Sequence, residues 1–137
     1  MDWVQIKDYM LVVEKDKTIQ QYSSLSLKLE ENDDYALYTR HCLDDVPFIQ
    51  FLQRFGIEQT KPVSLQALAV EQGAAILFTG KFYFEGYLEL GEYDLWDIVL
   101  GDAVLSFTNE GDAPFSTSNT SFVEISFEMV KASRVKL

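Results

Sequence analysis

Residues 78–90 read FTGKFYFEGYLEL, and apolar and polar side chains alternate along this run. A period of two is typical of a strand that buries one face. As one strand, the run would span about 40 Å, well beyond the usual strand length. Two interpretations stay open: Thr79 and Gly80 form a turn, or Gly86 marks a bulge or bend. Either interpretation predicts a strongly curved sheet.

The two faces of this run differ in chemistry. The inward set is predicted to comprise Phe78, Phe82, Phe84, Leu88 and Leu90, and the outward set Thr79, Lys81, Tyr83, Glu85, Tyr87 and Glu89.

Other segments alternate in the same way. Residues 24–30 and 35–42, separated by a polar stretch, predict a β-hairpin across residues 24–42. A short strand followed by a polar loop is predicted after residue 102. Residues 122–130 predict a final strand. Its inward side chains are predicted to be Val123, Ile125, Phe127 and Met129.

One segment has helical rather than strand periodicity. In residues 43–57, four apolar side chains recur at helical spacing, and Asp44 or Asp45 precedes them as a candidate N-cap. Pro47 is tolerated in a first turn, and Gly56 is a natural stop. The four side chains are those of Phe48, Phe51, Leu52 and Phe55.

Two segments fit both a helix and a strand. Residues 64–73 combine a Ser64 cap and a Gly73 stop with alternation, and residues 3–13 fit either period. Taken together, the 137 residues predict one α+β domain over 1–137. A mainly antiparallel, curved sheet of six to eight strands would carry one or two helices, and a closed β-barrel is the alternative.

Cysteine content and hydropathy suggest a compartment. Cys42 is the one cysteine, so no intrachain disulfide can form, whereas secreted domains of this size often carry more. Charges interrupt the first residues, and the longest apolar runs are too short to span a bilayer. These features predict a cytoplasmic protein.

Negative charge is concentrated in the second half of the chain. The net charge is −11. Residues 81–130 hold ten acids and one base, Lys81, whereas the last seven residues hold three bases and no acid. Nucleic acid and anionic membranes are therefore disfavoured partners, since both bind through Lys and Arg. A basic protein is the natural partner on electrostatic grounds.

No pattern of catalytic or metal-binding residues emerges. His41 and Cys42 are adjacent, so on the predicted strand they would point to opposite faces and could not act together. Phosphate-binding glycine loops, nucleophile elbows and paired cysteines for zinc do not occur. The acidic runs 30–34 and 109–113 lack calcium-loop spacing and are interpreted as turns. No cofactor or metal is predicted, and enzyme activity stays open without support.

Tyrosines and carboxylates are interleaved through residues 83–97, with no base among them. Tyrosine offers a broad, stiff contact surface, and neighbouring carboxylates can pair with Arg or Lys. Trp96 is either a further anchor or a core residue. Cross-strand packing of the tyrosines is the alternative reading. The predicted partner-binding residues are Tyr83, Glu85, Tyr87, Glu89, Glu92, Tyr93, Asp94 and Asp97.

Three functions follow from these patterns. The first is a non-enzymatic acidic protein that docks a basic protein, as immunity proteins, antitoxins and phage-encoded inhibitors do. The second is a small-molecule carrier or enzyme whose ten phenylalanines partly line a pocket in a curved sheet. The third is a self-assembling, phage-type structural subunit that forms homo-oligomers through a strand edge. The first requires that the acids share one outward side and escape neutralisation by the basic C-terminal residues.

Overall fold

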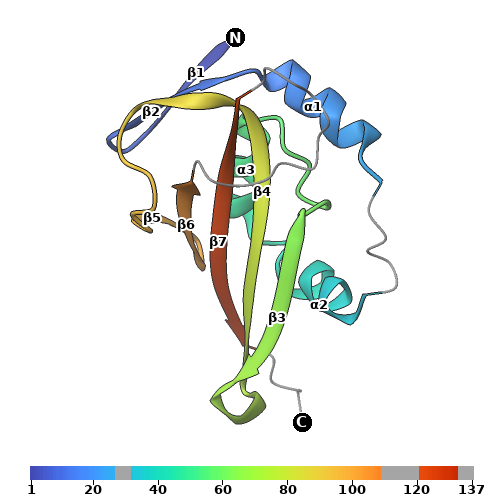
Figure 1. Cartoon of the computed structure of the whole chain (residues 1–137). Coiled ribbons are helices and arrows are strands. Elements are labelled where there is room, and N and C mark those ends of the chain that lie inside the picture. The colour runs from blue at the N-terminus through green and yellow to red at the C-terminus, as the bar shows by residue number, and fades with distance from the viewer. Residues whose placement is uncertain (27–31, 109–120, 133–137) are drawn as a thin grey trace.

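A curved antiparallel sheet and three helices make up the described part of the chain in the computed structural model (Figure 1). The structure describes residues 1–26, 32–108 and 121–132. The strands are β1 (Asp2–Ile6), β2 (Tyr9–Val13), β3 (Ser64–Val70), β4 (Ala75–Leu90), β5 (Ile98–Leu100), β6 (Ala103–Thr108) and β7 (Phe122–Ala132). The helices are α1 (Lys15–Ser24), α2 (Asp33–His41) and α3 (Val46–Arg54), with a 3-10 turn, η1 (Glu71–Gly73), between β3 and β4.

The strands follow the order β1-β2-β4-β7-β6-β5, and β3 also pairs with β4. All these pairings are antiparallel. The predicted α+β class with a curved antiparallel sheet is therefore confirmed. The closed barrel is wrong for the described residues, because β1 and β5 share no ladder. A side-chain contact links the two ends of the sheet instead: Tyr9, the first residue of β2, donates a hydrogen bond at 2.6 Å to Oδ1 of Asp97, the residue before β5.

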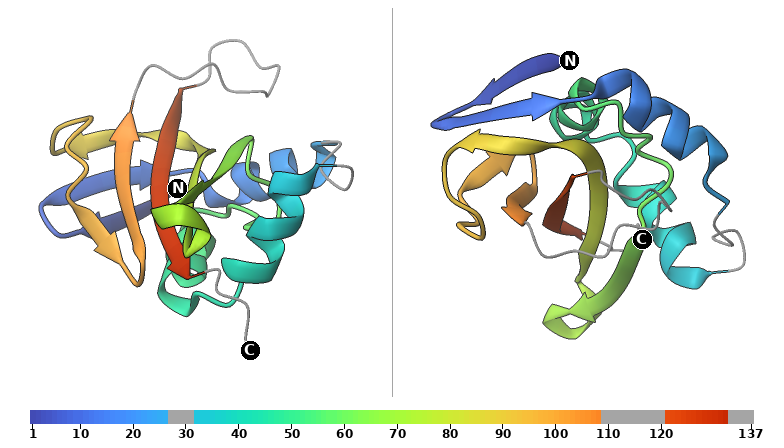
Figure 2. Two further views of the ribbon diagram at one scale, coloured as in Figure 1. Left: turned by 90° about the horizontal axis from the view of Figure 1, so that it is seen from below. Right: turned by 45° about the horizontal axis from the view of Figure 1, so that its top comes forward.

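β4 is one strand of 16 residues, and Gly86 allows it to bend. Up to Glu85 it pairs with β7, and from Gly86 onward it pairs with β2 (Figure 2). Gly86 has φ +151°, and a Cβ there would lie 2.0 Å from the Val12 carbonyl oxygen. The bend at Gly86 is therefore confirmed, and a turn at Thr79 and Gly80 is not formed.

The hydrophobic core lies between the inner face of the sheet and α3. Phe48 and Leu52 of α3 and its C-cap residue Phe55 are fully buried, and Asp45 is the N-cap of the helix, as predicted. Aromatic rings fill this space: Phe55 lies 4.6 Å from Phe84 between ring centroids, and Phe48 lies 5.1 Å from Phe127. The inward residues predicted for β7 are all buried. The phenylalanines thus pack mainly against one another.

α1 completes the hydrogen bonding of β4 where no strand is available. β3 and β2 share one edge of β4 but leave a gap between them. In this gap the Tyr83 amide donates to the Tyr22 hydroxyl at 2.9 Å, and the Glu85 amide donates to Thr18 Oγ1 at 3.0 Å. Two side chains of one helix face therefore act as acceptors that a strand would otherwise supply.

One sequence prediction is overturned in the region between α1 and α3. The hairpin across residues 24–42 is wrong: residues 33–41 form α2, whose Asn32 side chain accepts from the Asp34 and Tyr35 amides. Tyr35, Tyr38 and Cys42 recur at helical spacing, which the strand interpretation overlooked. Residues 27–31 and 109–120 lie outside the described residues, so the strand predicted at 24–30 and the loop at 109–113 fall largely there.

The two ambiguous segments both contain strands. Residues 64–70 are β3, and residues 3–13 lie in the β1–β2 hairpin. α1 was not predicted at all. In the described part of the chain, no helix combines the length and apolar character needed to cross a membrane.

Replacing Gly86 tests the bend. We expect Gly86→Ala to lower the free energy of unfolding by at least about 3 kcal/mol, because the new Cβ collides with the Val12 backbone. Gly73→Ala is the control: its φ is also positive, at +89°, but no atom lies within 4 Å of the added Cβ. Gly73→Ala should lower the free energy of unfolding by only about 1–2 kcal/mol. Equal losses in urea denaturation would contradict this account.

Replacing Thr18 tests the role of α1. Thr18→Val keeps the side-chain shape but leaves the buried Glu85 amide without its acceptor. We expect a loss of about 1–3 kcal/mol in the free energy of unfolding. Thr39→Val removes an exposed hydroxyl that bonds within α2, and should change stability by less than about 0.5 kcal/mol. Similar losses for the two variants would show that the α1 contact is not needed.

Candidate protein-docking surface

Two of the eight predicted partner-binding residues are not on the surface. Tyr83 is 4% exposed, and Glu85 is 9% exposed. Tyr83 donates a hydrogen bond to Glu124 at 2.9 Å, and Glu85 accepts from Gln21 at 2.8 Å. Both side chains therefore serve internal contacts. The alternation predicted their face correctly but could not show that this part of the face is covered.

Each of these buried carboxylates has a nearby lysine. Lys17 Nζ lies 3.7 Å from Glu85, and Lys81 Nζ lies 3.7 Å from Glu124. A buried carboxylate needs hydrogen bonds and an opposite charge to offset its lost hydration. The basic residues next to these strands are thus used for internal pairing.

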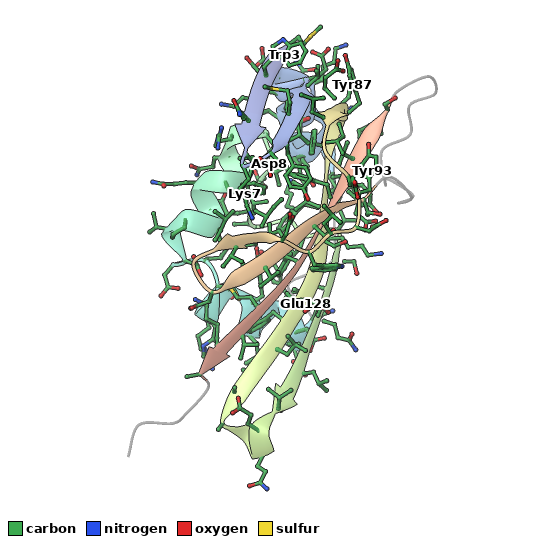
Figure 3. All side chains as sticks on the ribbon, turned by 90° about the vertical axis from the view of Figure 1, so that its left-hand side faces the viewer. Trp3, Lys7, Asp8, Tyr87, Tyr93 and Glu128 are labelled. Carbon is green, nitrogen blue, oxygen red and sulfur yellow. The ribbon has the colours of Figure 1, made fainter. Side chains whose placement is uncertain are left out.

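The other six predicted residues lie on one continuous segment from Tyr87 to Asp97. Tyr87, Glu89, Glu92 and Asp94 are exposed, while Tyr93 and Asp97 are half-buried. Figure 3 shows Tyr87, Tyr93 and Glu128 following one another down one side of the molecule.

Exposed apolar side chains accompany these acids. Leu90 and Leu95 are 62% and 47% exposed, Trp96 is 41% exposed, and Val99 is 67% exposed. We call residues 87–99 the 87–99 surface. Its combination of exposed aromatic and aliphatic groups with carboxylates is typical of a protein-binding patch.

Leu90 was predicted to face the core, and this is wrong. Leu88 pairs with Leu11, whereas Leu90 pairs with Met10, so the ladder shifts by one residue between them. A bulge of this kind reverses the face of every later side chain. Leu90 is therefore exposed. Trp96 is also not a core residue, which leaves it available as an anchor.

Residues 91–97 have no regular secondary structure, but contacts along their length hold them in place. Gly91 lies against the Tyr9 ring, and the Asp94 amide donates to the Phe107 carbonyl at 2.8 Å. Asp97 accepts from the Tyr9 hydroxyl, and its carbonyl accepts from Lys7 at 2.7 Å. The segment is thus presented in a fixed conformation, which lowers the entropic cost of binding.

Two residues of this segment have unusual backbone angles. Asp94 and Trp96 have φ of +65° and +55°. Positive φ is uncommon outside glycine and is an outlier for a bulky residue such as tryptophan. Such strain persists only where surrounding contacts impose it, and it clusters at functional sites. The conformation of Trp96 therefore supports a role for this segment beyond connecting two strands.

The exposed acids of the surface have no ion-pair partner among the residues that the structure describes. Within residues 1–26, 32–108 and 121–132, Glu89, Glu92 and Asp94 form no ion pair, although the Lys7 ammonium donates to the Asp97 carbonyl nearby. Lys131, from the basic C-terminal end, binds elsewhere: its Nζ lies 3.1 Å from Asp45 and 2.8 Å from Asp102. In the described part of the chain, acids therefore outnumber bases on the 87–99 surface.

Tyr9 lies close to these acids, and its pKa is raised. Burial raises its pKa well above the ordinary value, and the hydrogen bond to Asp97 and the charges of Asp97, Glu92 and Asp8 raise it further. Each effect favours the neutral phenol.

Catalytic groups are not assembled among the described residues. Cys42 is fully buried, and burial raises the pKa of its thiol to about 12, so it is a poor nucleophile. His41 and Cys42 lie at the end of α2 rather than on a strand. Across residues 1–26, 32–108 and 121–132, no group of three His, Cys, Asp or Glu side chains could hold a metal ion.

Compared with known proteins, the chain matches no family model, no curated protein and no solved structure.

The titration of Tyr9 tests whether the neighbouring Asp97 carboxylate raises the pKa of the phenol. Because its folded pKa lies above the unfolded value of about 10, its contribution to stability is full below about pH 10 and is lost as pH rises toward the folded pKa. We expect Asp97→Asn to lower the pKa of Tyr9, as followed by NMR of labelled tyrosine. Glu58→Gln is the control: Glu58 does not contribute to the raised pKa of Tyr9, so this substitution should leave that pKa unchanged. If the pKa of Tyr9 stays the same in Asp97→Asn, Asp97 does not raise it and this explanation is wrong.

Proposed function

We propose that this chain is a non-catalytic binding protein that docks a basic protein partner through the 87–99 surface. The proposal is supported by exposed carboxylates that form no ion pair within the described residues and that lie beside exposed Leu90, Leu95 and Trp96 on one segment held by hydrogen bonds. Apolar groups supply affinity on desolvation, and the carboxylates raise the association rate and select a cationic partner. This is how immunity proteins, antitoxins and protein inhibitors work as a class.

The single cysteine is a free, buried thiol, which fits a reducing compartment. The proposal therefore places the interaction in the cytoplasm. The acidic surface also argues against nucleic acid and anionic membranes as partners, because both repel uncompensated carboxylates.

The other two functions receive less support. The phenylalanines that suggested a pocket lining pack against one another in the core. Self-assembly through a strand edge at β5, which overlaps the 87–99 surface, would bring the carboxylates of that surface against those of a second copy, which costs electrostatic energy. A basic partner avoids this repulsion.

The test is a charge-reversal pair. Wild-type protein is immobilised to recover partners from a lysate of the source cells, and a recovered protein is then purified for kinetics. We expect Glu92→Lys/Asp94→Lys to lower the association rate constant at least about tenfold, and higher salt to lower it for wild type. The control, Asp44→Lys/Glu71→Lys, makes the same net charge change at exposed positions outside the surface.

Equal binding by the two double variants would overturn the proposal, as would a rate that ignores salt. Recovery of only the chain itself, with a dimer mass in light scattering, would favour self-assembly instead.

A further inference from the structure

A hollow of about 220 Å³ lies on the outer face of the sheet, on the side opposite α3. It opens over β3, β4 and β7, and Trp96 of the 87–99 surface lines it. We call it the Trp96 hollow. Its lining residues are Ser64, Thr79, Gly80, Lys81, Trp96, Ser126, Phe127 and Glu128.

We infer that the Trp96 hollow accepts an arginine side chain of the basic partner. This inference rests on the proposed function and names the contact that would anchor the basic partner. Trp96 belongs both to the hollow and to the 87–99 surface, so a partner docked on that surface has side chains within reach of the hollow. A hollow of this volume is too small for most cofactors but suits one long side chain.

The charges that line the hollow favour a cation. Lys81 is the only base in the lining, and its ammonium lies 3.7 Å from the buried Glu124 carboxylate, which compensates it. Glu128 is exposed, and no ion pair within the described ranges involves it. The uncompensated charge of the lining is therefore the Glu128 carboxylate.

The arrangement fits guanidinium better than ammonium. Arginine is planar, stacks on aromatic rings and binds a carboxylate through two parallel hydrogen bonds. Trp96 supplies the best aromatic surface for a cation, and Glu128 supplies the carboxylate. The hydroxyls of Thr79, Ser64 and Ser126 line the same space and can accept remaining N–H groups, although Ser126 already donates to Glu124 at 2.7 Å.

The register of the sheet fixes these groups relative to one another. Thr79 pairs directly with Glu128, and Lys81 pairs with both Ser64 and Ser126. The carboxylate and the hydroxyls thus stand on neighbouring rows of one rigid sheet. Sites on regular elements hold their geometry better than sites on loops.

Fluorescence of Trp96 tests the inference. The chain has two tryptophans, so Trp3→Phe leaves Trp96 as the sole reporter. The probe is N-acetyl-arginine amide, and N-acetyl-citrulline amide is the neutral control of the same shape. We expect a saturable change with arginine at a dissociation constant on the order of millimolar, as befits a small ligand, and none with citrulline.

Glu128→Gln, made in the same background, should weaken arginine binding at least about fivefold, since it removes the charge but keeps the shape. Glu71→Gln removes an exposed carboxylate outside both the lining and the 87–99 surface and should leave binding unchanged. Equal responses to arginine and citrulline, equal effects of the two variants, or no response at all would overturn the inference. If salt-dependent partner binding through the 87–99 surface persists in that case, only the arginine anchor fails and the proposed function stands.

Discussion

The fold depends on β4, a single strand of sixteen residues whose hydrogen-bonding partners change along its length. β7 pairs with one edge of β4 from Ala75 to Glu85, while β3, the hydroxyls of α1 and β2 follow one another along the other edge. The change of partner at Gly86 turns the last residues of β4 away from β7 and toward β2. That turn brings the 87–99 surface over the side of the sheet, where Tyr9 and Phe107 hold it. The position of the 87–99 surface is thus a consequence of how β4 is bent.

Sequence patterns predicted those elements whose side chains repeat with one clear period. α3 was predicted with its cap and buried face, and β7 with its inward residues, because both carry an unbroken apolar series. α1 was missed because its apolar residues are few: it buries only Thr18 and Tyr22. Its stability comes from tertiary contacts, such as the Thr18 bond to β4, that a local pattern does not encode. α2 was missed for another reason, because the helical spacing of Tyr35, Tyr38 and Cys42 was overlooked in favour of strand alternation.

The candidate site was predicted in part for a similar reason. Alternation placed Tyr83 and Tyr87 on the same outward face, yet Tyr83 is 4% exposed and Tyr87 is 46% exposed. Period two reveals which face a side chain takes but not whether that face is covered. The bulge near Leu90 and the positive φ of Trp96 likewise depend on distant partners, Met10 and the contacts around Asp97. The apolar half of the surface could therefore be found only in three dimensions.

The distribution of charge follows from the cost of burial. A carboxylate taken out of water requires a cation and hydrogen bonds, while an exposed one is stabilised by solvent. Lys17, Lys81 and Lys131 accordingly lie beside Glu85, Glu124 and Asp45, the carboxylates that the fold buries. Within the described residues, no base is paired with Glu89, Glu92 or Asp94 of the 87–99 surface. The lysines beside β4 and β7 thus pair with buried carboxylates, while the acids of the 87–99 surface lie next to exposed apolar side chains. A basic partner would pair with these acids and cover the apolar side chains at the same time.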